Sequence, residues 1–374
     1  MRHLYFDNNA TTALDPRVKE AMEEVLSPIP FNPSSVHSFG RNAKALLVEA
    51  RDTISHFLRV KPHELIFTSG GTESLNMLLQ GFYALHPGCH IISSNVEHSC
   101  VYNTLQFLEK KGAKVSYLPA GLWGALRPSQ IEEAITHQTK LITLMSVNNE
   151  TGVKTDIAAI ASIAKTRNIP FIVDAVSHLG KELFHIPEGV LAMAFGAHKL
   201  HGPQGIGLAW IKPGFKFEPL LLGGPQEYGK RPGSENLAGI VGFAKAIELL
   251  HTELPAATER MEKLRNHLVD SLMFKLGNIL IHGEGPRICN TAHIAFPGVE
   301  AESLLMQLDM AGISTSHGSA CSSGGLEPSR VLLNMGIPSS VAQSSLRFSL
   351  SRQTTQLDVD TASDIICDLI RKMR

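Results

Sequence analysis

The chain has 374 residues, with 34 lysines and arginines against 35 aspartates and glutamates and a formal net charge of −1. This length suits about two and a half domains of ordinary size, which bury their cores without disulfide or metal support. A nearly neutral chain does not have the composition of a strongly basic nucleic-acid-binding protein, so we expect no direct nucleic-acid partner. Charged residues make up only 18% of the chain, below the typical ~25%, which favours a surface partly buried against a second copy.

The cysteine usage and the apolar runs exclude further classes of protein. The chain has five cysteines at wide spacing and no C-x-x-C pair, so neither a disulfide framework nor a zinc site is indicated. Residues 1–12 lack the apolar run of a signal peptide, and the most apolar later stretch, residues 239–250, contains Lys245 and Glu248. We therefore expect a cytoplasmic globular enzyme without a membrane span or a metal.

Short apolar runs alternate with helical patterns through the first two-thirds of the chain. Strand-like runs occur at residues 64–68, 90–94, 114–118, 140–147, 171–175, 191–195 and 205–211. This alternation predicts an α/β fold, with a mostly parallel sheet covered by helices on both faces. Ligands of such sheets bind beyond the carboxyl ends of the strands. We therefore expect the site in the loops that follow Thr68, Ser94, Val147, Asp174 and Phe195.

The pattern changes after the glycine- and proline-rich residues 221–236. A long helical pattern covers about 237–276, and two strand-like runs at 288–296 and 345–350 follow, with further helical patterns between and after them. This order predicts a smaller α+β domain attached through the long helix.

Three short segments of the first part are candidates for binding a ligand. In SGGTES (69–74) the glycines permit a close backbone approach, and the helix start at Thr72 favours a phosphate, although glycine turns before helices are common. Asp174 ends an apolar strand, where it either caps the next segment or holds a cationic ligand nitrogen. Lys199 lies in FGAHKLHGPQGIG (195–207), either as a solvated surface group or as a desolvated amine that forms a Schiff base.

Together these segments supply the groups that hold pyridoxal phosphate. The lysine binds the aldehyde, the aspartate pairs with the pyridinium nitrogen, and the helix start neutralises the phosphate. His98, at another strand end, could stack on the ring or relay protons, or be a structural histidine.

Cys321 lies among small, flexible, polar residues in STSHGSACSSGGLEPSRVL (314–332). A free thiol has a pKa near 8.5, so a modest electrostatic effect produces a useful thiolate near neutral pH. Cys321 is therefore either a mobile nucleophile or an ordinary exposed thiol.

The chain resembles cysteine desulfurases of the NifS/IscS type, in the class V aminotransferase superfamily of fold-type I pyridoxal-phosphate enzymes. The matching segments run nearly end to end: YFDNNATT, NPSSVHSFGR, IFTSGGTES, EHS, VNNETG, VDAVSH, AHKLHGPQGIG, RPGSE, GSACSSGGLEPS and LRFSLSR. The resemblance implies a large cofactor domain (16–255) with a mostly parallel seven-stranded sheet between helices. It also implies a smaller α+β domain (1–15 and 256–374) that carries the catalytic cysteine loop.

The resemblance also implies roles for individual residues. Lys199 matches the Schiff-base lysine that also moves the α-proton, Asp174 its pyridinium partner, and His98 the histidine stacked on the ring. Arg347 matches the arginine that binds the substrate carboxylate, and Cys321 the cysteine that takes the sulfur.

The remaining matches concern the oxygens and the phosphate of the cofactor. Asn149 lies near the phenolic oxygen, while Gly71, Thr72 and His198 match the phosphate side. Ser234 matches a hydroxyl residue that reaches the phosphate of the neighbouring subunit, which implies a homodimer.

The chain departs from the family pattern at three places. Gly196 replaces a common phosphate-binding serine, and Ser177 replaces a common glutamine near the phenolic oxygen, so cofactor affinity or electronics can differ. The sequence also ends 22 residues after Arg352, which puts the usual iron–sulfur scaffold contact in doubt.

The expected reaction converts L-cysteine to L-alanine and forms a persulfide on Cys321, which passes its sulfur to an iron–sulfur scaffold or a sulfur relay protein. The alternatives are a selenocysteine lyase or an aminotransferase on the same fold, or a non-catalytic paralogue that acts as a binding protein.

Overall fold

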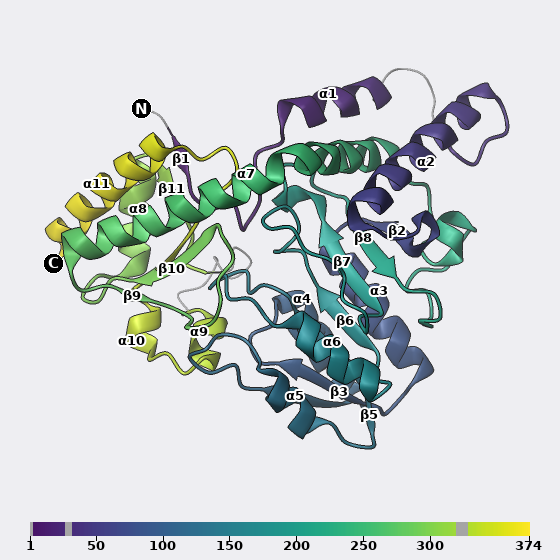
Figure 1. Cartoon of the computed structure of the whole chain (residues 1–374), viewed down its shortest axis with the longest axis horizontal. Helices are drawn as coiled ribbons and strands as arrows, with labels where there is room; N and C mark the ends of the chain where they lie inside the picture. The colour runs from purple at the N-terminus through teal and green to yellow at the C-terminus, as the bar shows by residue number, and fades with distance from the viewer. Residues whose placement is uncertain (1–2, 27–31, 319–327) are drawn as a thin grey trace.

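The computed structural model describes residues 3–26, 32–318 and 328–374, and a seven-stranded sheet forms the centre of its larger part (Figure 1). The strands, in sheet order, are β2 (Leu65–Thr68), β8 (Gly207–Ile211), β7 (Ala192–Gly196), β6 (Phe171–Asp174), β5 (Thr139–Met145), β3 (His90–Ser94) and β4 (Lys114–Leu118). All neighbours pair in parallel except β8, which runs antiparallel to both β2 and β7. The expected mostly parallel seven-stranded sheet is confirmed.

Both faces of this sheet are buried because helices cover each of them, and successive side chains of a strand point to the two faces in turn. In β6, Phe171 and Val173 pack in the core on one face, together with residues of α1 (Pro16–Val25), α2 (Ser38–Leu58) and α6 (Ile157–Thr166). Ile172 packs on the other face, against α3 (Gly71–Leu85) and α4 (Ser99–Lys110). Burial on both faces explains why the strands are nearly continuous apolar runs in the sequence.

The long helix α7 (Leu237–Leu276) passes from the large sheet to a second core (Figure 1). Its first half, through Leu254, packs in the core of the seven-stranded sheet, and its second half, from Leu264, packs with the C-terminal elements. Pro255 lies within the helix between these halves. We propose that the domain boundary lies there.

The second core covers a three-stranded antiparallel sheet in the order β12 (Ser345–Ser349), β10 (Thr291–Ala295), β9 (Leu280–Ile281). Helices α8 (Ala301–Met310) and α11 (Gln356–Met373) pack on it. The N-terminal β1 (Leu4–Tyr5) pairs in parallel with β11 (Ile313–Ser314), which joins the first residues of the chain to this part. The expected strand at 288–296 is shorter, since only Thr291–Ala295 pairs with its neighbours.

The remaining helices of the described residues are short: η1 (Pro62–Glu64), α5 (Pro128–Ala134), η2 (Ala197–Lys199), η3 (Gln226–Gly229), α9 (Arg330–Asn334) and α10 (Ser339–Ala342).

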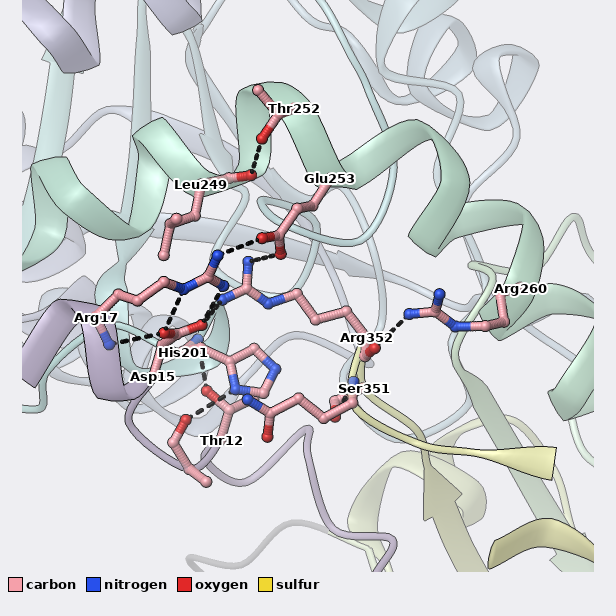
Figure 2. A network of polar contacts seen from close by, with 12 residues as sticks. Thr12, Asp15, Arg17, His201, Leu249, Thr252, Glu253, Arg260, Ser351 and Arg352 are labelled. Atoms are coloured by element: carbon pink, nitrogen blue, oxygen red, sulfur yellow. Dashed lines mark hydrogen bonds and ion pairs between the residues drawn. The ribbon is translucent and has the colours of Figure 1, made fainter. Parts of the chain in front are cut away.

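A partly buried cluster of ion pairs joins the N-terminal segment, α7 and the chain that leaves β12 (Figure 2). Arg352 contacts Asp15 at 2.6 Å and Glu253 at 2.9 Å, and Arg17 contacts the same two carboxylates at 2.8 and 2.7 Å. The side chains of Asp15 and Arg352 are only 3% and 4% exposed. Hydrogen bonds from Arg17 are the main cause that lowers the pKa of Asp15 to about 2.

The Asp15→Asn variant is expected to lose about 3 kcal/mol of stability, because it leaves part of the buried Arg352 charge without its partner. Since the pKa of Asp15 is lowered in the fold, this stabilisation is present above about pH 4 and is lost as the pH falls towards 2. Urea unfolding of the cofactor-free protein at neutral pH measures the first effect, and unfolding between about pH 4 and about pH 2 measures the second. The exposed Glu259–Lys263 pair supplies the control, and Glu259→Gln should leave the stability nearly unchanged. Equal effects of the two variants would contradict the expectation.

Candidate active site

A cavity of about 260 Å³ lies where the parallel strands of the large sheet end. Nine of the predicted site residues line it: Gly71, Thr72, His98, Asn149, Asp174, Ser177, His198, Lys199 and Arg347. They come from four of the five expected loops, from the start of α3 and from β12. Ser234 does not line this cavity but lies exposed in the segment before α7, and Cys321 lies outside the described residues.

The glycine turn between β2 and α3 brings an open helix N-terminus to this cavity. Gly70 occupies the N-cap position and has no side chain with which to cap the first turn. A Cβ atom on Gly71 would lie 2.4 Å from the Val176 Cγ2 atom, so only glycine lets this turn approach the loop after β6. Uncapped N–H groups at the positive end of a helix dipole favour a phosphate.

Asp174 ends β6 and is buried, with 6% of its surface exposed. Its Oδ1 atom accepts the Val176 N–H at 2.9 Å, so it does cap the following turn. Burial raises the pKa of this carboxyl group. A cation in the cavity would therefore relieve the cost of ionising it.

Lys199 lies on the short turn η2, directly after β7. It is only 8% exposed, which excludes a solvated surface lysine, and its Nζ atom lies 3.4 Å from the Ser177 Oγ atom. The turn is fixed from the N-terminal segment, because Thr12 donates to the His198 carbonyl oxygen through its N–H at 2.9 Å and its hydroxyl at 3.0 Å. The His201 N–H donates back to the Thr12 Oγ1 atom at 2.7 Å.

His98 caps α4 and is held in one tautomer by Cys100. The Cys100 N–H donates to the His98 Nδ1 atom at 3.2 Å, so this nitrogen is an acceptor and the ring proton is on Nε2. The Cys100 Sγ atom lies 3.0 Å from the same nitrogen. Burial lowers the pKa of His98 to about 4 and raises the pKa of the Cys100 thiol, so both groups are neutral near pH 7. Cys100 is not among the residues predicted from the sequence, although it lies two residues after a candidate histidine.

Arg347 reaches the cavity from β12 and is 1% exposed. Its Nη2 atom contacts the Asp7 Oδ1 atom at 2.6 Å, and its Nη1 atom donates to the Asn149 carbonyl oxygen at 3.0 Å. Within the described part of the chain, its buried Nε atom has no hydrogen-bond partner. A carboxylate ligand would satisfy this donor. Asp7, the counterion of this arginine, is also not among the residues predicted from the sequence.

Glu97, next to His98, is buried with 1% of its surface exposed, and burial raises its pKa to about 8. Its Oε1 atom accepts the Ser94 hydroxyl at 2.5 Å. Because the pKa is raised in the fold, stability is intact below about pH 4.5 and falls as the pH rises through 8.

In Glu97→Gln the side chain resembles the protonated acid, so the variant should not lose stability as the pH rises through 8. The variant is expected to match the parent near pH 5 and to exceed it by on the order of 2–4 kcal/mol near pH 9. Thermal unfolding at both pH values measures the difference, with the exposed Glu24→Gln as control. A parent whose stability falls no more than that of Glu97→Gln between these pH values would contradict the expectation.

Other kinds of site find no support in the described residues. Residues 3–26, 32–318 and 328–374 contain no group of three histidines, cysteines, aspartates or glutamates that could hold a metal ion. Within the same ranges, no helix has the length and apolarity needed to cross a membrane.

The donor set fits pyridoxal phosphate. A buried lysine amine, a buried carboxylate whose ionisation needs a cation, and an uncapped helix N-terminus surround one cavity. These groups match the aldehyde, the pyridine nitrogen and the phosphate of the cofactor. The fold and site therefore define a pyridoxal-phosphate-dependent enzyme of fold-type I.

The chain belongs to the class V aminotransferase family, since the sequence profile described as "Aminotransferase class-V" matches residues 4–361. It is 41% identical to "Cysteine desulfurase IscS" of Dictyoglomus turgidum, over all of this chain and 96% of the relative. It is 38% identical to "Cysteine desulfurase" of Nostoc sp., over all of this chain and 94% of the relative.

Solved structures agree with this assignment. A "NIFS-LIKE PROTEIN" superposes with a TM-score of 0.92 at 34% identity, covering 99% of this chain and all of the other. "SspA in complex with cysteine" superposes with a TM-score of 0.83 at 30% identity, covering 94% of this chain and all of the other. The expected family and fold are confirmed.

Proposed function

We propose that the protein is a pyridoxal-phosphate-dependent L-cysteine desulfurase, which releases L-alanine and keeps the sulfur as a persulfide on Cys321. One observation supports this function above all: Lys199, Asp174, His98 and Arg347 line one cavity, in a chain 41% identical to a relative named a cysteine desulfurase. A structural neighbour at 30% identity, SspA, is described in complex with cysteine.

Several residues of the cavity would hold the cofactor. Lys199 would bind it covalently, Asp174 would pair with its ring nitrogen and His98 would stack on the ring. Gly71, Thr72 and His198 would contact the phosphate, and Asn149 and Ser177 the phenolic oxygen. The bound cofactor withdraws electrons from the substrate's Cα atom.

The remaining groups act on the substrate. Arg347 binds the carboxylate, a task that its planar guanidinium suits. The Lys199 amine takes the α-proton and returns a proton to carbon. The Cys321 thiolate attacks the substrate sulfur, so that an S–S bond forms and the Cβ–S bond breaks. The electron pair of the broken bond stays on carbon, which takes up a proton to give alanine.

Two of the three departures from the family pattern, Ser177 and Gly196, are compatible with this function. The Ser177 hydroxyl lies within 3.4 Å of the Lys199 amine, where it can accept a hydrogen bond. A Cβ atom on Gly196 would lie 3.5 Å from both Val176 and His198, an ordinary contact distance, so the lost serine hydroxyl leaves space at the phosphate side. We propose that the cofactor binds somewhat more weakly as a result.

We also propose a cytoplasmic homodimer in which the exposed Ser234 reaches the phosphate in the partner's site. The persulfide on Cys321 would pass its sulfur to an acceptor protein, either an iron–sulfur scaffold or a sulfur relay protein.

Product analysis tests the proposed function. Purified protein loaded with pyridoxal phosphate is incubated with L-cysteine and a thiol reductant, and alanine and sulfide are quantified. Equal amounts of alanine and sulfide are expected. Formation of a keto acid from cysteine, or no turnover at all, would contradict the desulfurase assignment.

A further inference from the structure

A second lysine is buried beneath the Lys199 turn. Lys181 is 2% exposed, and its Nζ atom donates a hydrogen bond to the Lys199 carbonyl oxygen at 2.8 Å. The preceding Gly180 has a φ of +82°, and a Cβ atom there would lie 2.5 Å from the Leu200 Cβ atom. This glycine therefore lets the loop after β6 approach the Lys199 turn closely.

The amine of Lys181 has no carboxylate partner among the ion pairs of the described residues. Burial is the main cause that lowers the pKa of Lys181, and the basic groups of Lys199 and Arg352 lower it further wherever they are protonated. Glu182, the next residue, is directed elsewhere: it accepts from the Lys154 amine and from the Cys289 N–H, each at 2.9 Å.

The other groups around Lys181 are neutral. Burial raises the pKa of the Cys289 thiol to about 12, so this thiol supplies no negative charge near neutral pH. Thr258 of α7 donates its hydroxyl to the Lys181 carbonyl oxygen at 2.7 Å. Burial lowers the pKa of Lys181 itself to about 8, so most of its population is still charged at pH 7.

An uncompensated buried charge reduces stability, and a buried methionine of similar volume would not. Buried ionisable groups with strongly shifted pKa values cluster at functional sites. The hydrogen bond to Lys199 indicates which function this charge serves.

We propose that Lys181 is a positioning residue: its buried ammonium group fixes the Lys199 turn and opposes protonation of the Lys199 amine. This inference rests on the proposed function of Lys199. A fixed cation near an amine disfavours a second cation there. The Lys199 amine thereby stays available to take a proton from the substrate near neutral pH.

Two variants separate the charge from the hydrogen bond. Lys181→Met removes both, whereas Lys181→Gln keeps a donor for the carbonyl oxygen without a charge. Lys165→Met is the matched control, because it removes the same charge from an exposed ion pair with Glu188. All proteins are loaded with pyridoxal phosphate, and their visible absorption is titrated from about pH 6 to about pH 10.

The pH at which the absorption changes should rise by roughly one unit in both Lys181 variants, the size expected for a unit charge several ångströms away. It should stay unchanged in Lys165→Met. An unchanged transition in both Lys181 variants would overturn the proposal. A rise in Lys181→Met alone would also overturn it, because the hydrogen bond and not the charge would then be responsible.

Thermal unfolding of the cofactor-free proteins gives a second measurement. Lys181→Met should lose little stability, because removal of the uncompensated charge offsets the lost hydrogen bond. A marked loss of stability together with an unchanged absorption transition would overturn the proposal in favour of a purely structural role. Failure of the proposed function is recognised separately, by a cofactor that stays covalently bound to Lys199→Ala.

Discussion

Replacing Cys321 with alanine is expected to lower sulfide and alanine production from L-cysteine by at least about a hundredfold, because the variant lacks the nucleophile. Cysteine should still bind, since Arg347 and the cofactor-binding residues are unchanged. The visible spectrum of the loaded variant should therefore still change when cysteine is added. Rate and spectrum together separate loss of chemistry from loss of binding.

Cys100 provides the matched control for this variant, because it is the cysteine that lines the described cavity. Burial raises the pKa of its thiol, and the thiol is engaged with the His98 Nδ1 atom, so it is a poor substitute nucleophile. Cys100→Ser should keep turnover within about a few-fold of the parent. Turnover that survives in Cys321→Ala and disappears in Cys100→Ser would reverse the assignment.

Lys199→Ala is the second variant with a large expected effect. It removes the covalent attachment of the cofactor and the group that moves the α-proton, so turnover should fall by about a thousandfold or more. The visible band of the covalently bound cofactor should disappear, while pyridoxal phosphate still binds non-covalently through Asp174 and the start of α3. Absorption spectra and dialysis of the loaded variant measure these effects.

If the cofactor stays covalently bound to Lys199→Ala through dialysis, another lysine must carry it. Lys181, whose amine reaches the Lys199 carbonyl oxygen, would be the first to examine. Lys165→Met controls for the loss of a lysine as such, and its spectrum should equal that of the parent.

Much of the site could be predicted because strand ends are visible in the sequence. The apolar run of residues 171–174 ends at Asp174, and β7 ends immediately before the turn that carries Lys199. Parallel strands place their carboxyl ends at one edge of a sheet, so the local patterns predict that these residues lie close together.

Contacts between distant segments could not be predicted in this way. Asp7 and Arg347 are 340 positions apart and meet because the chain before α1 runs alongside β12. Lys181 was missed for a related reason: a lysine after a glycine is usually exposed, and only the packing of two loops buries it. Cys100 lies beside a predicted residue but has no sequence pattern of its own.

The direction of β8 was also missed, although the sequence contains its cause. Residues 197–206 join β7 to β8, and they also form the Lys199 turn. Parallel neighbours need a crossover of a dozen or more residues, usually with a helix, so this connection is too short. The antiparallel pairing of β7 and β8 follows from that length.

The most direct test of the desulfurase assignment is the mass of the peptide that contains Cys321 after brief incubation with L-cysteine. The protein is loaded with pyridoxal phosphate, reacted without reductant, alkylated and digested. One additional sulfur atom on the Cys321 peptide is the predicted result, and it should be absent in Lys199→Ala. Alanine formation with unmodified Cys321, or with the additional sulfur on another cysteine, would contradict it.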